Sequence, residues 1–142
     1  MYTLYEIAEL RQKCYELELE NCHILDKYTD FELQNICNGI GSELFPDEVR
    51  KLVSAMHPTL QPVAFIHDVE WYESDADHFT FSESNARFKT NGYICAKAKY
   101  PWYHPLRYIV MAQAYRLGNT CQLAGWFAYA KCFYDRKEKN DG

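Results

Sequence analysis

The segment Gln61–Tyr72, QPVAFIHDVEWY, predicts a helix around which the rest of the chain is organised. Pro62 stands at a first helical position, where its missing N–H costs nothing. The apolar residues in this segment recur at helical spacing: Phe65, Ile66, Val69 and Tyr72. His67 and Asp68 interrupt the apolar run. Because a buried histidine or carboxylate is costly without a partner, the two are either a satisfied pair at the edge of a core or a functional site.

Helical periodicity and helix-start signals recur upstream of this segment. From about Thr3, apolar residues at spacings of three and four predict an amphipathic helix that can extend to Leu25. Thr29–Glu32 has the form of a capping box and predicts a short helix that ends at about Ile36. Pro46 then opens a further helix.

Downstream, a second capping box at Thr80–Glu83 predicts a long helix over 81–99. Asn85 falls on the apolar stripe of this helix, and we expect its amide to be hydrogen-bonded to a neighbouring helix, because an unpaired buried amide is costly. Gly92 lies on the same stripe and would let two helix backbones approach closely. The sequence therefore predicts a central antiparallel helix pair at about 61–73 and 81–99.

The last third of the chain is rich in aromatic residues. Pro105 starts a helix whose predicted inward side carries Tyr108, Ile109, Ala112 and Tyr115. Gly118-Asn119 predicts a break before a final helix, unless the two segments form one bent helix. The charged residues 136–142 predict a disordered tail. No segment shows the alternation typical of strands, so we expect an all-α fold of about five to seven helices in one domain, residues 1–135.

The composition favours a folded, acidic protein. A chain of 142 residues can bury one core, and a hydrophobic content of 48% excludes extensive disorder. The net charge of −5 argues against a nucleic-acid partner held by phosphate contacts. No signal sequence and no run of about eighteen apolar residues is present, which predicts a cytoplasmic protein without a transmembrane segment. The six cysteines include no CxxC pair and are expected to be free thiols rather than three disulfides.

Three of the predicted features together suit the metal-assisted hydrolysis of an ester. The segment 37–41, CNGIG, predicts a glycine-rich turn with exposed backbone carbonyls. With the Asp68 carboxylate, these carbonyls would suit Ca²⁺, which prefers oxygen ligands and can polarise a carbonyl group. His67 could take a proton from the attacking water, while Asn85 holds its other ring nitrogen. The simpler interpretation is a helix C-cap beside a satisfied polar pair.

The same segments resemble the phospholipase A2 superfamily, in which a calcium loop is followed by a helix with a His-Asp pair and by an antiparallel helix with a second aspartate. The matching segments are 37–41 (CNGIG), 65–68 (FIHD) and 82–88 (SESNARF). The resemblance implies that His67 is a general base oriented by Asn85. It also implies a Ca²⁺ site formed by Asp68, Asn38, Gly39 and Gly41. A similar combination of CNGIG, FIHDV and N-x-R-F recurs in small proteins of bacterial prophages.

The chain also departs from this family. The family's cysteines on either side of the His-Asp pair are absent, with Ala64, Phe65 and Trp71 in their place. Asn85 replaces the second carboxylate, so it can accept a hydrogen bond from the imidazole but cannot stabilise an imidazolium by charge. We therefore expect any phospholipid hydrolysis to be slow.

Other functions also fit the sequence. A non-enzymatic protein of the prophage type could use the helical scaffold to bind a protein partner through exposed Trp102, Tyr103 or Trp126. The aromatic and basic connector over 97–108, KAKYPWYHPLRY, would equally suit a lipid interface. A transition-metal site at the histidines is a further interpretation, although the sequence has no HExxH or comparable close pair.

Overall fold

The computed structural model describes residues 2–39 and 47–141. Within these ranges the chain forms α-helices and no β-strand, which confirms the predicted all-α class. The helices are α1 (Leu4–Glu16), α2 (Asp30–Gly39), α3 (Asp47–Ser54), α4 (Gln61–Tyr72), α5 (His78–Lys99), α6 (Pro105–Ala124) and α7 (Trp126–Asp141). Two short 3₁₀ helices, η1 (Cys22–Lys27) and η3 (Pro58–Leu60), lie between them.

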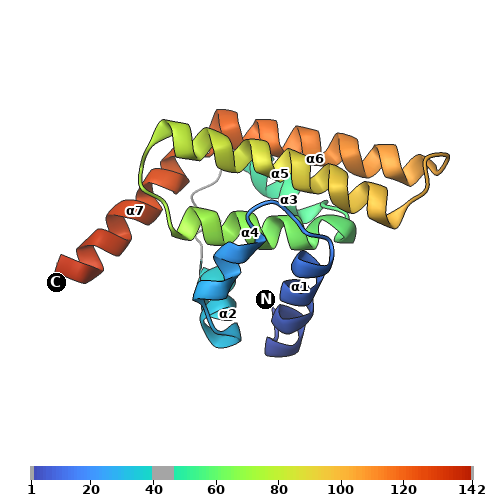
Figure 1. The fold of residues 1–142 in the computed structure, drawn as a ribbon. Coiled ribbons are helices and arrows are strands. Elements are labelled where there is room, and N and C mark those ends of the chain that lie inside the picture. Colours follow the sequence, from blue (N-terminus) through green and yellow to red (C-terminus); the bar gives the residue numbers. More distant parts are fainter. Residues whose placement is uncertain (1, 40–46, 142) are drawn as a thin grey trace.

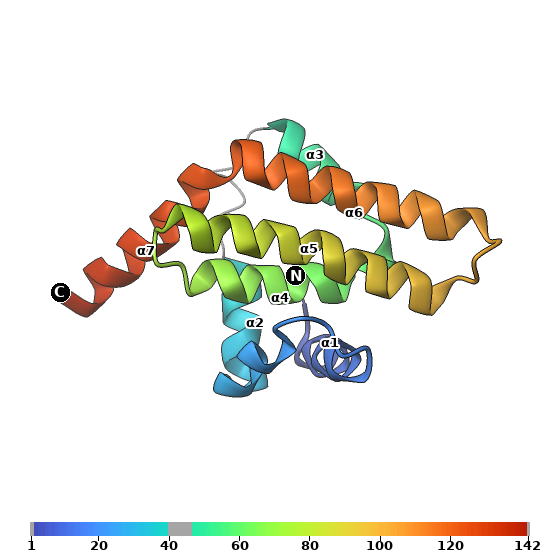
Figure 2. The same cartoon turned by 45° about the horizontal axis from the view of Figure 1, so that its top comes forward.

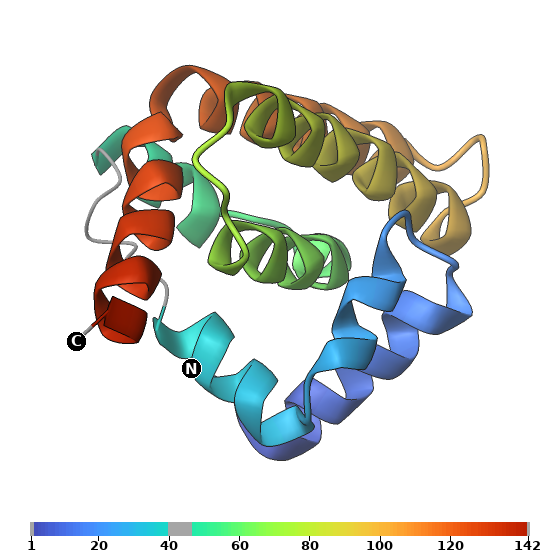
Figure 3. The same cartoon turned by 60° about the vertical axis from the view of Figure 1, so that its left-hand side comes forward.

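Helix α4 occupies the centre of the molecule, as its apolar pattern predicts. Helices α1, α2, α5 and α7 all contact it, and Figure 3 shows the other helices arranged around it. Helices α5 and α6 form a long antiparallel hairpin along one side of α4, while α1 and α2 cover the other side (Figures 1 and 2). Most residues of α4 are buried, because a helix enclosed on several sides has no solvent face to keep polar.

The core consists of two hydrophobic clusters that meet along α4. The larger cluster includes Phe65 and Ile66 and extends into α1, α2, α5 and α6. The smaller cluster surrounds Trp71 and Tyr129, which are packed with Phe81 beneath the start of α7. One helix therefore links both clusters, and it also carries His67 and Asp68.

Helices α5 and α6 approach each other closely at Gly92. A β-carbon built on Gly92 would lie only 2.3 Å from the β-carbon of Ala114 on α6. One turn farther along α6, a β-carbon on Gly118 would lie 3.1 Å from the carbonyl oxygen of Asn85. The prediction that Gly92 permits close helix packing is confirmed.

Gly92→Ala should therefore destabilise the protein by about 2 kcal/mol, because overpacking at this contact outweighs the gain in helix propensity. Urea denaturation would measure this loss. The double variant Gly92→Ala/Ala114→Gly exchanges the two side chains and should recover most of the stability. A Gly92→Ala variant as stable as the wild type would show that the two helices can separate at little cost.

Several predicted boundaries in the first half of the chain were wrong. Helix α1 ends at Glu16 and not near Leu25, because Glu18 and Asn21 adopt positive φ values of 51° and 63° and turn the chain into η1. The capping box at Thr29–Glu32 is confirmed by both of its reciprocal hydrogen bonds. Helix α2 nevertheless continues past position 36 to Gly39.

The start of α5 also differs from the prediction. The helix begins at His78, and its N-cap is Asp77, whose Oδ1 accepts hydrogen bonds from the backbone N–H groups of Phe79 (2.8 Å) and Thr80 (3.3 Å). The Thr80 hydroxyl instead donates to Asp75 Oδ2 at 2.9 Å. Asp77 is therefore the N-cap, three residues before the predicted cap Thr80, and its carboxylate accepts from two backbone N–H groups at once.

Helix α6 buries a different face from the predicted one. Tyr108, Ile109, Ala112 and Tyr115 are exposed. The buried face is made of smaller or shorter residues: Val110, Ala114, Leu117, Gly118 and Cys121. The close approach of α5 requires small residues at the contact, so the large aromatic residues turn outward.

The predicted break at Gly118-Asn119 was also wrong, because α6 runs through both residues and ends at Ala124, where Gly125 separates it from α7. Residues 136–141, for which the sequence predicts a disordered tail, are helical in the structure. Arg136 donates hydrogen bonds to the carbonyl oxygens of Tyr72 and Ser74, so it links α7 to the end of α4.

Candidate functional site

His67 and Asn85 meet in the interior, as the sequence predicts. His67 lies on α4 with only 7% of its surface exposed, and its Nε2 is 3.0 Å from Asn85 Oδ1 on α5. The imidazole packs between two aromatic rings, with centroid distances of 4.8 Å to Trp71 and 5.2 Å to Phe88. The antiparallel pairing of α4 and α5 thus brings together two polar side chains that are 18 positions apart.

A chain of hydrogen bonds matches the tautomer of His67 that carries its proton on Nε2. Asn85 Nδ2 donates to Gln122 Oε1 at 2.8 Å, and Gln122 Nε2 donates to Ser82 Oγ at 2.9 Å. Because the amide nitrogen of Asn85 is used as a donor to Gln122, its oxygen accepts the Nε2–H of His67. The Nδ1 atom of His67 therefore carries the lone pair, which is the arrangement that a general base needs.

The role of Gln122 was not predicted from the sequence, because the predicted break at Gly118-Asn119 placed this residue outside α6. Because α6 is uninterrupted, Gln122 lies beside Asn85 of α5.

Burial keeps the imidazole uncharged at neutral pH. Desolvation lowers the pKa of His67 to about 4, although the hydrogen bond to Asn85 opposes this effect. A neutral imidazole can accept a proton, whereas an imidazolium cannot. In this respect the site meets the requirement for a general base.

Asp68 follows His67 on α4 and lies within electrostatic range of α2, α6 and α7. Burial is the first cause and the Asp68 carboxylate a further cause of the raised pKa values of Cys37, Cys121 and Cys132 on these three helices, which places the carboxylate near all of them. Desolvation raises the pKa of Asp68 itself to about 7. The pKa of Tyr2 is also raised, first by burial and then by the Asp68 carboxylate, so the Tyr2 phenol lies near this carboxylate.

The described part of the predicted calcium loop is helical. Residues 37–39, including Asn38 and Gly39, form the last turn of α2, while Gly41 lies outside the described residues. The carbonyls in the last turn of a helix have no partner within the helix and remain available to a ligand. Among the described parts of the chain, no group of three or more histidine, cysteine, aspartate or glutamate side chains could hold a metal ion.

The other histidines that were considered for a transition-metal site have structural contacts. His57 Nδ1 accepts from the backbone N–H of Thr59 at the start of η3 (3.2 Å), and His104 Nδ1 accepts from that of Leu106 at the start of α6 (3.1 Å). His78 stacks on Trp126 with a centroid distance of 3.6 Å. All six cysteines are free, as predicted.

A second buried polar pair, which the sequence did not predict, lies beside the site. Glu70 is 8% exposed on α4, and its Oε2 accepts from Arg87 Nε on α5 at 2.7 Å and from Asn21 Nδ2 at 3.2 Å. In the segment SESNARF, Arg87 follows Asn85 by two residues. This spacing was the one sign in the sequence that a second polar side chain of α5 lies close to α4. Both α4–α5 polar contacts therefore come from one short segment of α5.

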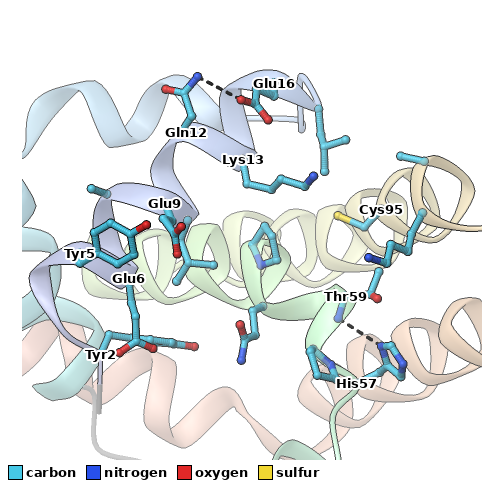
Figure 4. A pocket seen from close by; sticks show the side chains of 18 residues that line it. Tyr2, Tyr5, Glu6, Glu9, Gln12, Lys13, Glu16, His57, Thr59 and Cys95 are labelled. Carbon is cyan, nitrogen blue, oxygen red and sulfur yellow. Dashed lines mark hydrogen bonds between the residues drawn. The ribbon is translucent and has the colours of Figure 1, made fainter.

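A groove of about 930 Å³ lies elsewhere, between α1, η3 and the end of α5 (Figure 4). Glu6, Glu9 and Glu16 line it from α1, and Lys99 lines it from α5. Neither His67 nor Asp68 nor Asn85 is among its lining residues. The predicted site and this groove are therefore separate features of the molecule.

Comparisons with protein-family models, with curated proteins and with solved structures find no match for this chain. Within the described residues, no helix combines the length and the apolar character needed to cross a membrane.

Proposed function

We propose that this protein is a calcium-dependent hydrolase of phospholipid acyl esters, with His67 as its general base. The observation that carries the proposal is the hydrogen bond of 3.0 Å between His67 Nε2 and Asn85 Oδ1, which leaves the lone pair of Nδ1 free on a neutral imidazole. The resemblance of the three segments to the phospholipase A2 superfamily supports the same assignment.

In the proposed reaction, Nδ1 of His67 accepts a proton from a water molecule whose oxygen attacks the acyl carbon. The imidazolium then returns the proton to the alcohol oxygen as the ester bond breaks. Asn85 holds the Nε2–H throughout and thereby keeps the ring oriented. Because Asn85 contributes no charge, the imidazolium is less stabilised than it would be beside a carboxylate, and turnover should be slow.

The calcium ion would be held by Asp68 together with Asn38, Gly39 and Gly41. The Asp68 carboxylate fits this role because desolvation raises its pKa to about 7, and a bound cation would relieve the cost of the buried charge. When bound, Ca²⁺ supplies a Lewis acid for the substrate carbonyl.

The test is the release of fatty acid from phospholipid in mixed micelles. The wild type should show slow release that requires Ca²⁺, and His67→Gln should reduce it by about 100-fold, the scale of general-base catalysis. Asn85→Asp should increase release by about tenfold, because the new carboxylate stabilises the imidazolium and the Gln122 amide can turn to donate to it. His23→Gln, at an exposed histidine on η1, is the matched control and should leave the rate unchanged.

The outcome that contradicts the proposal is a wild type and an Asn85→Asp variant that are both folded and show no release above a control without enzyme. A merely structural pair would also gain nothing from Asn85→Asp, because a buried carboxylate would then only destabilise the fold.

The second candidate function is that of a non-enzymatic protein whose helical scaffold binds a protein partner. It is favoured by large apolar side chains left exposed around the junction of α6 and α7, where Leu123 and Phe127 are 89% and 78% exposed. The hydrolysis assay separates the two candidates, since this one expects no release under any condition.

A further inference from the structure

The charges of this acidic protein are distributed very unevenly along the chain. Residues 84–134, which make up most of the α5–α6 hairpin and the first half of α7, contain no aspartate or glutamate. Seven of the 15 basic residues and none of the 20 acidic residues fall in this segment, so it carries +7 while the rest of the chain carries −12. The net charge of −5 therefore conceals a hairpin, residues 78–124, that carries six basic residues against Glu83 alone, with Arg87 paired to Glu70 of α4.

The hairpin ends in an exposed aromatic turn. Trp102 and Tyr103 lie between α5 and α6, 72% and 69% exposed, and their ring centroids are 5.7 Å apart. This turn lies at the opposite end of the molecule from α7 (Figure 1). Neighbouring exposed aromatic rings rimmed by polar residues are typical of surfaces that bind a partner or a membrane.

The backbone of the turn is well supported, so the exposure of these rings is built into the fold. The backbone N–H of His104 donates to the carbonyl of Pro101 at 3.0 Å, and the His104 side chain caps α6. The Tyr108 hydroxyl donates to the carbonyl oxygen of Trp102. A turn held in this way loses little conformational entropy when its side chains bind a surface.

Basic side chains flank the two rings. Lys97 and Lys99 are exposed on the last turn of α5, and Arg107 lies on the first turn of α6. Lys99 also borders the groove that contains Glu9 and Glu16 of α1. Attraction to an anionic surface should therefore depend on several basic residues together rather than on Lys99 alone.

We propose that this turn docks onto an anionic lipid surface, with the rings of Trp102 and Tyr103 among the headgroups and Lys97, Lys99 and Arg107 against their negative charges. Tryptophan and tyrosine favour the membrane interface, because each has an apolar ring and a polar hydrogen-bonding group. Each basic residue near an anionic membrane adds attraction.

A lipid surface fits this chemistry better than a nucleic acid or a protein. A nucleic acid that extended beyond the turn would meet the remainder of the chain, which carries −12. A stable protein partner buries about 800 Å² on each side, so it would have to extend from the turn along the exposed face of α6 that carries Tyr108 and Ile109. A planar membrane can touch the turn alone.

This docking goes beyond the proposed hydrolysis and does not depend on it. Asn85 is 14 residues from the end of α5, so His67 and its partner lie roughly 20 Å from the turn along the helix. Vesicles of ether-linked phospholipids contain no acyl ester, so they test docking without any hydrolysis.

The experiment is co-sedimentation of the full chain with ether-linked vesicles, either purely phosphatidylcholine or with an added fraction of phosphatidylglycerol. The wild type should bind the anionic vesicles, bind the neutral ones weakly, and be released by high salt. The triple variant Lys97→Gln/Lys99→Gln/Arg107→Gln should bind about 100-fold more weakly, at about fivefold per basic residue. Its control, Arg50→Gln/Lys51→Gln/Lys139→Gln, has the same net charge and should bind like the wild type.

The aromatic residues are tested in the same way. Trp102→Ala/Tyr103→Ala should lose at least tenfold in binding. Phe31→Ala/Phe79→Ala removes two aromatic side chains that are 61% and 73% exposed elsewhere, and it should bind like the wild type. Brominated lipid should quench the fluorescence of Trp102 in the wild type. The Trp102→Phe variant lacks this tryptophan, so its remaining tryptophan fluorescence should not be quenched.

The proposal is overturned if the wild type binds neutral and anionic vesicles equally, or if it binds neither. It is also overturned if the turn variants and their controls lose binding to the same extent. Tighter binding to an oligonucleotide than to anionic vesicles, with the same dependence on Lys97, Lys99 and Arg107, would replace the lipid by a nucleic acid.

Discussion

Asp68→Asn should stabilise the calcium-free protein by about 3 kcal/mol at pH 8, the scale of a carboxyl whose pKa is raised to about 7. Because this carboxyl has its raised pKa only in the folded state, the folded protein binds more protons than the unfolded chain between about pH 4 and pH 7. Stability therefore falls as the pH rises through this window, and asparagine removes that loss.

Urea denaturation of the wild type and Asp68→Asn at several pH values measures the effect. The two proteins should differ most at pH 8 and converge near pH 4, where aspartate is neutral in both states. Asp26→Asn is the control, because Asp26 is an exposed residue whose pKa is lowered by its hydrogen bonds to Tyr15 and His23. That variant should show no gain in stability.

Calcium should narrow this difference in stability. If Asp68 holds Ca²⁺, a concentration of tenfold the dissociation constant would stabilise the wild type by about 1.4 kcal/mol and leave Asp68→Asn unchanged. A wild type whose melting temperature does not respond to millimolar Ca²⁺ would remove the metal from the proposed function. A variant no more stable than the wild type at pH 8 would show that the carboxylate is solvated.

Arg87→Met should destabilise the protein by about 3–4 kcal/mol at pH 8, because it leaves the buried Glu70 carboxylate without its charged partner. Burial raises the pKa of Glu70 to about 7 even though Arg87 opposes this effect, so the cost should shrink below pH 7 as Glu70 takes up a proton. Urea denaturation at pH 8 and pH 5 measures both the loss and its dependence on pH.

Two further variants make this test specific. Arg87→Met/Glu70→Gln removes both charges and should recover most of the lost stability. Lys27→Met breaks an exposed ion pair with Glu73, at 3.0 Å, and should cost less than about 1 kcal/mol. If Arg87→Met cost no more than Lys27→Met, the Glu70–Arg87 pair would be as weak as a surface pair.

Much of the polar interior was predictable from local rules. The position of Asn85 on an apolar stripe required a partner on another helix, and the structure supplies His67 and Gln122. Gly92 inside a helix required a close neighbour, and Ala114 is that neighbour. These predictions succeeded because a buried amide and a glycine within a helix both carry a cost that only a tertiary contact offsets.

Other features followed from contacts between distant segments. The exposed face of α6 was predicted to be buried, because large apolar residues usually point inward. The small residues that meet α5 decided its rotation instead. Likewise, Gly118 allows close packing against α5 and does not break the helix. Helix α6 continues past Gly118, so Gln122 lies within the helix and contacts Asn85.

By itself, the sequence determined the helical class, the central place of Gln61–Tyr72, and the proline and capping signals that start several helices, because these depend on residues close together in the chain. The tertiary structure alone decided which nitrogen of His67 bears the proton, how far the Asp68 carboxylate is desolvated, and that Trp102 and Tyr103 extend into solvent. Protonation and exposure depend on the groups that surround a side chain, and those groups come from helices far apart in the sequence.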